Sequence, residues 1–83
     1  MNLQEFIKKR KYLFWDVRLD GLDESAVVER ILNYGDWDDV QEMFEIIEIK
    51  KVAEIFDKQI AQIRNNYRGQ IKNYYRMYFE KYV

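Results

Sequence analysis

The run from Glu29 to Phe44, ERILNYGDWDDVQEMF, constrains the fold more than any other part of this chain. It contains two amphipathic segments that are separated only by Gly35 and Asp36. A glycine directly after the last apolar residue of a helix is typical of a helix end, because glycine readily takes the positive φ angles found there. The side chain of Asp36 can accept a hydrogen bond from the free N–H groups of the next helix. The sequence therefore predicts two helices that meet at a tight corner, which is architecture rather than chemistry.

Two helices are expected before this corner. The first covers about residues 3–12, where Asn2 and Glu5 have the spacing of a capping box. The second begins after Asp23, which can act as its N-cap, and ends at Gly35. Between them, residues 13–22 lose helical periodicity, so we expect this stretch to be extended or looped. Phe14 and Trp15 lie in this stretch and are expected to anchor it to the core, because they are too apolar to be left in water.

Three further groups of apolar residues at helical spacing follow the corner. They consist of Trp37, Val40, Met43, Phe44 and Ile47, of Val52, Ile55, Phe56, Ile60 and Ile63, and of Ile71, Tyr75, Tyr78 and Tyr82. A break is expected near residues 47–49. Asn65, Asn66 and Gly69 indicate a bend or a stop before the last group, which leaves open whether residues 50–82 form one long helix or two.

Size and composition complete the prediction of the fold class. The chain has 83 residues, 48% of them hydrophobic and 35% charged, which suits a globular domain with one modest core. It has no Pro and only three Gly, so little interrupts its helices. We expect a single all-α domain over residues 1–83 with four to five short helices.

Several reactive side chains are missing from the sequence. It has no Cys, no His and no Thr, and Ser25 is its one Ser, which excludes Ser–His and Cys–His catalysis within the chain. Asp36, Asp38 and Asp39 could be read as a metal site, but acidic residues in the first turn of a helix are favoured as caps. We therefore expect a protein that is not an enzyme and uses no cofactor or metal; a catalyst built on carboxylates alone is the remaining enzymatic alternative.

The cellular location follows from segments that the sequence lacks. No apolar run approaches the roughly 20 residues that span a bilayer. The basic run at residues 8–11 is followed only by the short apolar run YLFW, which is not the layout of a signal peptide. We expect a cytoplasmic protein that does not bind membranes.

Charge is segregated along the chain, although the net charge is −1. Residues 1–11 carry four basic and one acidic residue, and residues 58–83 carry six basic and one acidic residue. Residues 36–57 carry two basic and eight acidic residues. The basic ends can pack against the acidic middle, or they can form a surface for an anionic partner, and both interpretations stay open.

The C-terminal helix is the strongest candidate for binding, because six aromatic residues lie between Tyr67 and Tyr82. These rings can form core, bind a protein partner or a second copy of the chain, or stack on unpaired bases. The expected partner-binding residues are Tyr74, Tyr75, Tyr78 and Tyr82. For the alternative of a small DNA- or RNA-binding regulator, the candidate residues are Lys8, Lys9, Arg10, Lys11, Arg64, Arg68, Lys72 and Arg76.

Three segments, FWDV at residues 14–17, VVERILNYGDWDDVQEMF at residues 27–44 and NYYRMYF at residues 73–79, resemble a family of small bacterial proteins of unknown function. Members of that family are often encoded beside nucleotidyltransferase-type toxins and are sometimes described as antitoxin-like. The chain departs from the family at Glu48, where members tend to have Gly, and at Arg68 and Gly69, where they tend to have a Ser-type cap. The resemblance implies a non-catalytic partner or regulator, and it transfers no catalytic residue.

Overall fold

A computed structural model describes residues 2–15, 22–62 and 65–83, and the described residues contain helices and no strand. The elements are α1 (Leu3–Lys9), a 3-10 turn η1 (Lys11–Leu13), α2 (Glu24–Tyr34), α3 (Trp37–Ile46), α4 (Ile49–Ile60) and α5 (Gly69–Tyr82). The predicted all-α fold is confirmed. Residues 50–82 belong to two helices rather than one, and the predicted break between α3 and α4 lies at Ile47 and Glu48.

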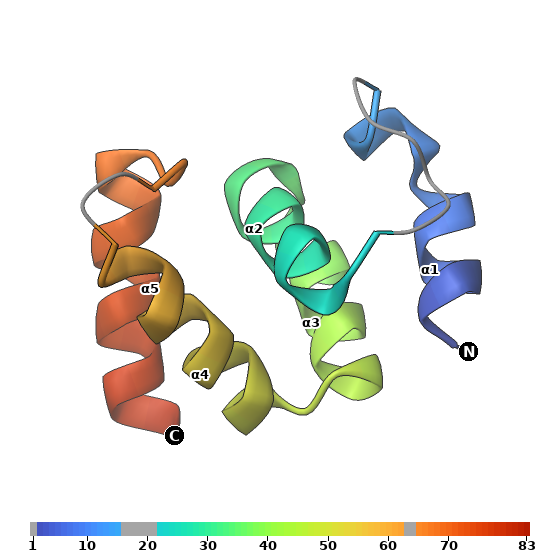
Figure 1. Ribbon diagram of the computed structural model, residues 1–83. Helices are drawn as coiled ribbons and strands as arrows, with labels where there is room; N and C mark the ends of the chain where they lie inside the picture. The colour runs from blue at the N-terminus through green and yellow to red at the C-terminus, as the bar shows by residue number, and fades with distance from the viewer. Residues whose placement is uncertain (1, 16–21, 63–64) are drawn as a thin grey trace.

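The helix α2 lies at the centre of the arrangement (Figure 1). It packs against α3, α4 and η1, and α5 packs against α4. In Figure 1, α1 and α5 are at opposite sides of the molecule, with α2 and α3 between them. Among the described residues, no helix is both long and apolar enough to cross a bilayer.

Every helix contributes large apolar side chains to one core. Its fully buried members are Phe6 and Ile7 of α1, Val27, Val28, Ile31 and Leu32 of α2, Val40 and Met43 of α3, and Val52 and Phe56 of α4. Tyr75 and Phe79 close the core from α5. Of the residues expected in the stripe of α4, Ile55 and Ile60 are only partly buried, and Ile63 lies outside the described residues.

The first helix is shorter than the sequence predicts. Asn2 caps it as expected, accepting a hydrogen bond of 2.9 Å from the N–H of Glu5, but the helix ends at Lys9. Arg10 leaves helical geometry with φ −121° and ψ 36°, and the 3-10 turn η1 follows. At this turn the side chain of Arg10 forms ion pairs with Asp39 and Glu42 of α3.

Gly35 ends α2 as predicted, but the predicted reason is wrong. Its φ of −75° and ψ of 157° are extended backbone that any residue can adopt. Glycine is needed here for space, because a Cβ atom would lie 2.8 Å from the carbonyl oxygen of Ile31 and 3.0 Å from the Cβ of Asp39. Crowding by the last turn of α2 and by Asp39 of α3, rather than a positive φ, therefore favours glycine at the corner.

Phe14 and Trp15, which precede α2, differ in their burial. Phe14 is buried in the core, as predicted. Trp15 is 62% exposed, so the prediction that it anchors the loop to the core is wrong. Its ring packs on the surface, edge-to-face against Tyr34 with ring centroids 5.3 Å apart, and beneath the guanidinium of Arg30. Of the predicted looped stretch, Leu13 belongs to η1, Phe14, Trp15 and Leu22 are non-helical, and residues 16–21 lie outside the described residues.

Candidate functional site

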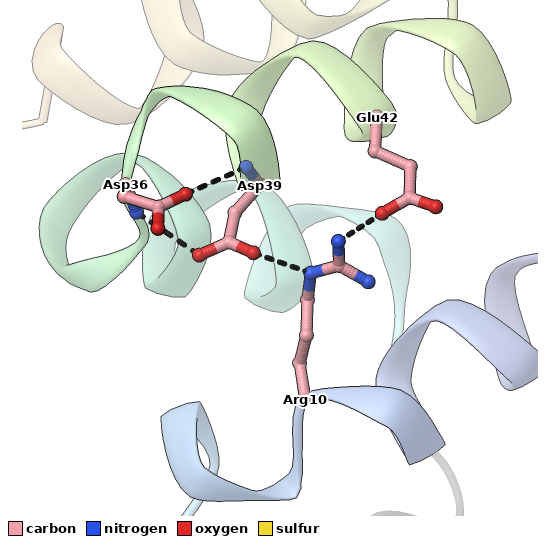
Figure 2. Close-up of polar contacts among 4 residues, drawn as sticks. All are labelled: Arg10, Asp36, Asp39 and Glu42. Atoms are coloured by element: carbon pink, nitrogen blue, oxygen red, sulfur yellow. Dashed lines mark hydrogen bonds and ion pairs between the residues drawn. The ribbon is translucent and has the colours of Figure 1, made fainter.

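The acidic residues at the α2–α3 corner act as helix caps. The side chain of Asp36 accepts a hydrogen bond of 3.0 Å from the N–H of Asp39, and the side chain of Asp39 accepts one of 3.0 Å from the N–H of Asp36 (Figure 2). This reciprocal pair is a capping box, which confirms the capping role predicted for these carboxylates. Asp38 is exposed in the same turn. Within the described residues, no group of three or more acidic side chains could hold a metal ion.

Arg10 joins the corner to the N-terminal segment. Its Nε lies 2.7 Å from Asp39 Oδ1, and its terminal nitrogen pairs with Glu42 (Figure 2). The guanidinium also lies 4.2 Å from the ring centroid of Phe6. Burial acts to lower the pKa of Arg10, but its hydrogen bonds with Asp39 and Glu42 outweigh burial and raise that pKa. The basic N-terminal segment thus packs against the acidic middle at this point, and Arg10 is a structural residue.

The basic residues considered for nucleic-acid binding do not form one surface. Lys8, Lys9 and Lys11 are exposed on α1 and η1, whereas Arg10 is partly buried and engaged in its ion pairs. Arg68, Lys72 and Arg76 lie in or next to α5, on the opposite side of the molecule (Figure 1). Arg64 lies outside the described residues. A single basic surface made of both segments is therefore not assembled.

The aromatic residues of α5 divide into two faces. Tyr75 is only 5% exposed and packs with Phe56 and Phe79 in the core, so its ring offers almost no surface to a partner. Tyr74 and Tyr82 are 53% and 57% exposed, and Tyr78 is half-buried between them. The structure therefore keeps three of the four predicted partner-binding tyrosines together on the surface and removes Tyr75 from the set.

The exposed tyrosines form a continuous surface with neighbouring residues. Tyr78 stacks on Tyr74 with ring centroids 6.2 Å apart, and Tyr82 lies 4.7 Å from Tyr78 by the same measure. Trp37 of α3 meets Tyr78 edge-to-face at 5.5 Å. Tyr74, Met77, Tyr78, Lys81 and Tyr82 line a shallow hollow of about 250 Å³. We call Trp37, Tyr74, Met77, Tyr78 and Tyr82 the outer aromatic face.

The phenols of Tyr75 and Tyr78 are neutral groups. Burial, followed by the neighbouring Tyr82 and Tyr74, raises the pKa of Tyr78. Burial also raises the pKa of Tyr75 to about 12. Both groups therefore stay protonated at neutral pH, so they can pack against apolar surface and donate a hydrogen bond but cannot act as bases.

A second concave surface was not predicted from the sequence. Trp15, Glu29, Arg30, Asn33, Tyr34 and Asn66 line a cleft of about 290 Å³, which we call the Trp15 cleft. The guanidinium of Arg30 lies 4.9 Å from the ring centroid of Trp15, and that of Arg68 lies 4.8 Å from the ring centroid of Tyr34. The missed signal is the spacing of Glu29, Arg30, Asn33 and Tyr34, which places all four on neighbouring positions of one helix face.

Asn33 holds one wall of the Trp15 cleft in place. Its side chain is buried, donates a hydrogen bond of 3.2 Å to the carbonyl of Asn66 and accepts one of 3.3 Å from the N–H of Arg68. Asn66 in turn donates to Glu29 at 2.9 Å. This network attaches the segment before α5 to α2 and fixes the position of Arg68 beside Tyr34.

Comparisons with known proteins give one match. A family described as "Family of unknown function (DUF6922)" matches residues 9–56, which include α2, α3 and most of α4 but end before α5. No curated protein and no solved structure matches the chain.

Proposed function

The chain belongs to this family of unknown function, since the match covers more than half of its residues, and we propose that it is a non-catalytic module that binds a protein partner. The observation that supports this proposal is the outer aromatic face. The matched residues end at Phe56, so the part of this face on α5 lies outside the family match.

Exposure and composition favour an interaction surface over a solvated one. Tyr74, Met77 and Tyr82 lie next to one another and each exposes more than half of its area. A contiguous patch of large apolar side chains on a surface usually marks an interface. Tyrosine and tryptophan are enriched among the residues that dominate binding energy, because they bury a large area with few rotatable bonds. Tyr75 and Phe79 fill the core side of α5, whereas Tyr74 and Tyr82 lie outside the core.

The charges around the face favour one kind of partner surface. The helix α5 carries Lys72, Arg76 and Lys81 against a single acidic residue, Glu80. Lys81 lines the hollow itself. A partner that offers an apolar groove with an acidic rim would complement the outer aromatic face.

The resemblance of the sequence supports a more specific form of the proposal. In that form, the protein is a bacterial, cytoplasmic, antitoxin-like module, and its partner is a nucleotidyltransferase-type toxin encoded beside it. The absence of Cys, His and Thr from the sequence agrees with a role without catalysis.

The proposal is tested by co-expressing the full chain with the product of the neighbouring gene and measuring binding by calorimetry. We expect Tyr74→Ser and Tyr82→Ser together to abolish binding. Tyr12→Ser is the matched control, because Tyr12 is 64% exposed on η1, away from the outer aromatic face. If the chain remains a lone monomer in light scattering and captures no product of the neighbouring gene, the proposal is wrong.

A further inference from the structure

The Trp15 cleft combines groups that the proposed function does not use. Its lining brings two aromatic rings, two side-chain amides, a carboxylate and the guanidinium of Arg30 into one concavity. The volume, about 290 Å³, is close to the lower limit of roughly 300 Å³ for ligand pockets. A ligand that fits must therefore be small, flat enough to contact the rings, and polar at its edges.

Trp15 provides a surface on which a flat ligand can stack. The guanidinium of Arg30 lies over its ring, and Tyr34 meets it edge-to-face. The side chain nevertheless remains 62% exposed, so much of the indole is accessible from solvent. Unpaired bases in protein complexes stack on aromatic rings, and the indole of Trp15 is such a ring.

The polar groups of the cleft suit the edge of a base. A carboxylate has about four lone-pair positions, so Glu29 can accept from a base amino group while it keeps its bond with Asn66. The cleft wall is already ordered, because Asn33 bonds to both Asn66 and Arg68. Binding would thus require little reorganisation of this wall.

Arg68 places positive charge beside the aromatic pair. Its guanidinium lies 4.8 Å from the ring centroid of Tyr34, which itself contacts Trp15. A guanidinium binds phosphate oxygens through two parallel N–H donors. A base stacked on Trp15 would therefore have a phosphate-binding group within the same surface.

We propose that the Trp15 cleft binds an unpaired nucleotide, with its base stacked on Trp15 and hydrogen-bonded to Glu29, and its phosphate bound by Arg68. The nucleotide is either free or part of a single strand. The site is separate from the outer aromatic face, so either proposal can fail without the other.

Intrinsic fluorescence provides the test. The chain has two Trp residues, Trp15 and Trp37, so Trp37→Phe leaves Trp15 as its one Trp, and excitation at a wavelength that tyrosine does not absorb selects its emission. Titration of this variant with the four ribonucleoside monophosphates and with single-stranded eight-residue RNA should quench Trp15 fluorescence in a saturable way. Quenching by monophosphates assigns the cleft to free nucleotides, and quenching by the oligomers alone assigns it to single strands.

Substitutions then separate the cleft from non-specific charge. With labelled ligand and fluorescence anisotropy, Trp15→Ala should lower affinity about 5- to 100-fold, which is the usual range for one stacked base. Arg68→Gln should lower it about tenfold, as expected for loss of a charge-assisted contact, because the backbone N–H that bonds to Asn33 is kept. Arg76→Gln, which removes an arginine charge inside α5, is the matched control and should leave affinity unchanged.

Three results would overturn the proposal. They are the absence of saturable quenching by any of these ligands, an equal loss of affinity in Arg68→Gln and Arg76→Gln, and equal affinity for double-stranded RNA. Far-ultraviolet circular dichroism of each variant shows whether the helices are retained, and Trp15→Phe, which keeps a ring, should bind more tightly than Trp15→Ala.

Discussion

The α2–α3 corner and the outer aromatic face differ in whether their side chains have partners within the protein. At the corner, each carboxylate of the capping box has a partner within the protein, and Arg10 adds two more contacts. On the outer aromatic face, the rings of Tyr74 and Tyr82 contact other rings on one side and water on the other. The comparison separates side chains that stabilise the fold from exposed side chains that are available for binding.

This difference guides where function should be sought. Every buried side-chain nitrogen and oxygen of the described residues has a hydrogen-bond partner, so the polar groups of the corner are used up in folding. Large exposed rings bring no comparable gain to the isolated chain. Substitutions at the corner should therefore change stability, and those on the outer aromatic face should change binding.

The largest effect is expected at Asp39. Asp39→Ala removes one half of the capping box and leaves Arg10 with a single carboxylate partner. The side chains of Asp39 and Arg10 are only 8% and 11% exposed. Breaking a buried ion pair from one side costs about 3–5 kcal/mol, which should appear as a lower midpoint in urea unfolding.

Asp38→Ala is the matched control for this prediction, because Asp38 is exposed in the same helical turn. It should cost at most about 1 kcal/mol, through its interaction with the helix dipole. Equal losses in the two variants would show that the corner carboxylates act only through the dipole, and the comparison with the outer aromatic face would fail.

A smaller loss is expected from Gly35→Ala. The added Cβ would meet the backbone oxygen of Ile31 at 2.8 Å, and a backbone atom cannot move aside as a flexible side chain can. Overpacking of this kind costs about 1–3 kcal/mol. Gly69→Ala adds the same methyl group at the start of α5, where nothing lies within 4 Å, and should be neutral or slightly stabilising. If both variants unfold at the same denaturant concentration, the corner is less tightly packed than the structure shows.

The helices could be predicted from the sequence because each is marked by local signals. Asn2, Asp23 and Asp36 cap their helices as expected, and the apolar stripes point to the core. Signals that depend on distant residues were missed. The ion pairs of Arg10, next to the end of α1, join residues about 30 positions apart, and part of the crowding at Gly35 comes from Asp39 of α3.

The functional surfaces show the same limit. Helical spacing alone placed Tyr75 with Tyr74 and Tyr78, but the packing of α5 on α4 decides which of these rings is buried. The Trp15 cleft combines residues from before α2, from α2 and from before α5, so helical spacing marks only its α2 wall and no local pattern brings Trp15 and Asn66 to it. Hydrophobicity alone predicts a buried Trp15. In the structure Trp15 is exposed, and its ring packs on the surface against Arg30 and Tyr34.

The free energy of unfolding should fall at alkaline pH, because the buried phenol of Tyr75 on the inner face of α5 then ionises more readily in the unfolded state. Burial raises the pKa of Tyr75 from 10.0 to about 12, and it raises that of Tyr67 in the same direction. The folded state therefore favours the protonated phenols, so their stability contribution is complete below pH 10 and is lost as pH rises towards 12. The share of Tyr75 in that loss should reach about 1 kcal/mol by pH 11.

Urea unfolding of Tyr75→Phe between pH 9 and pH 11 measures this share. The variant cannot ionise at residue 75, so its stability should fall less steeply with pH than that of the unmodified chain. The same slope in both proteins would mean that the phenol of Tyr75 is as solvated in the folded state as in the unfolded state, and that α5 has no distinct inner face.

The smallest effect on stability is expected on the outer aromatic face, where it is the most informative. Tyr74→Ser and Tyr82→Ser remove exposed rings, so each should change the free energy of unfolding by no more than about 0.5 kcal/mol. Tyr12→Ser, an equally exposed position on η1, sets the scale for the same substitution elsewhere. A loss of 2 kcal/mol or more, on the order of a core truncation, would mean that these rings belong to the fold, because contacts among Tyr74, Tyr78 and Tyr82 would then hold α5 in place. A near-zero change in urea unfolding, combined with loss of partner binding, is the result that separates a surface kept for recognition from one kept for folding.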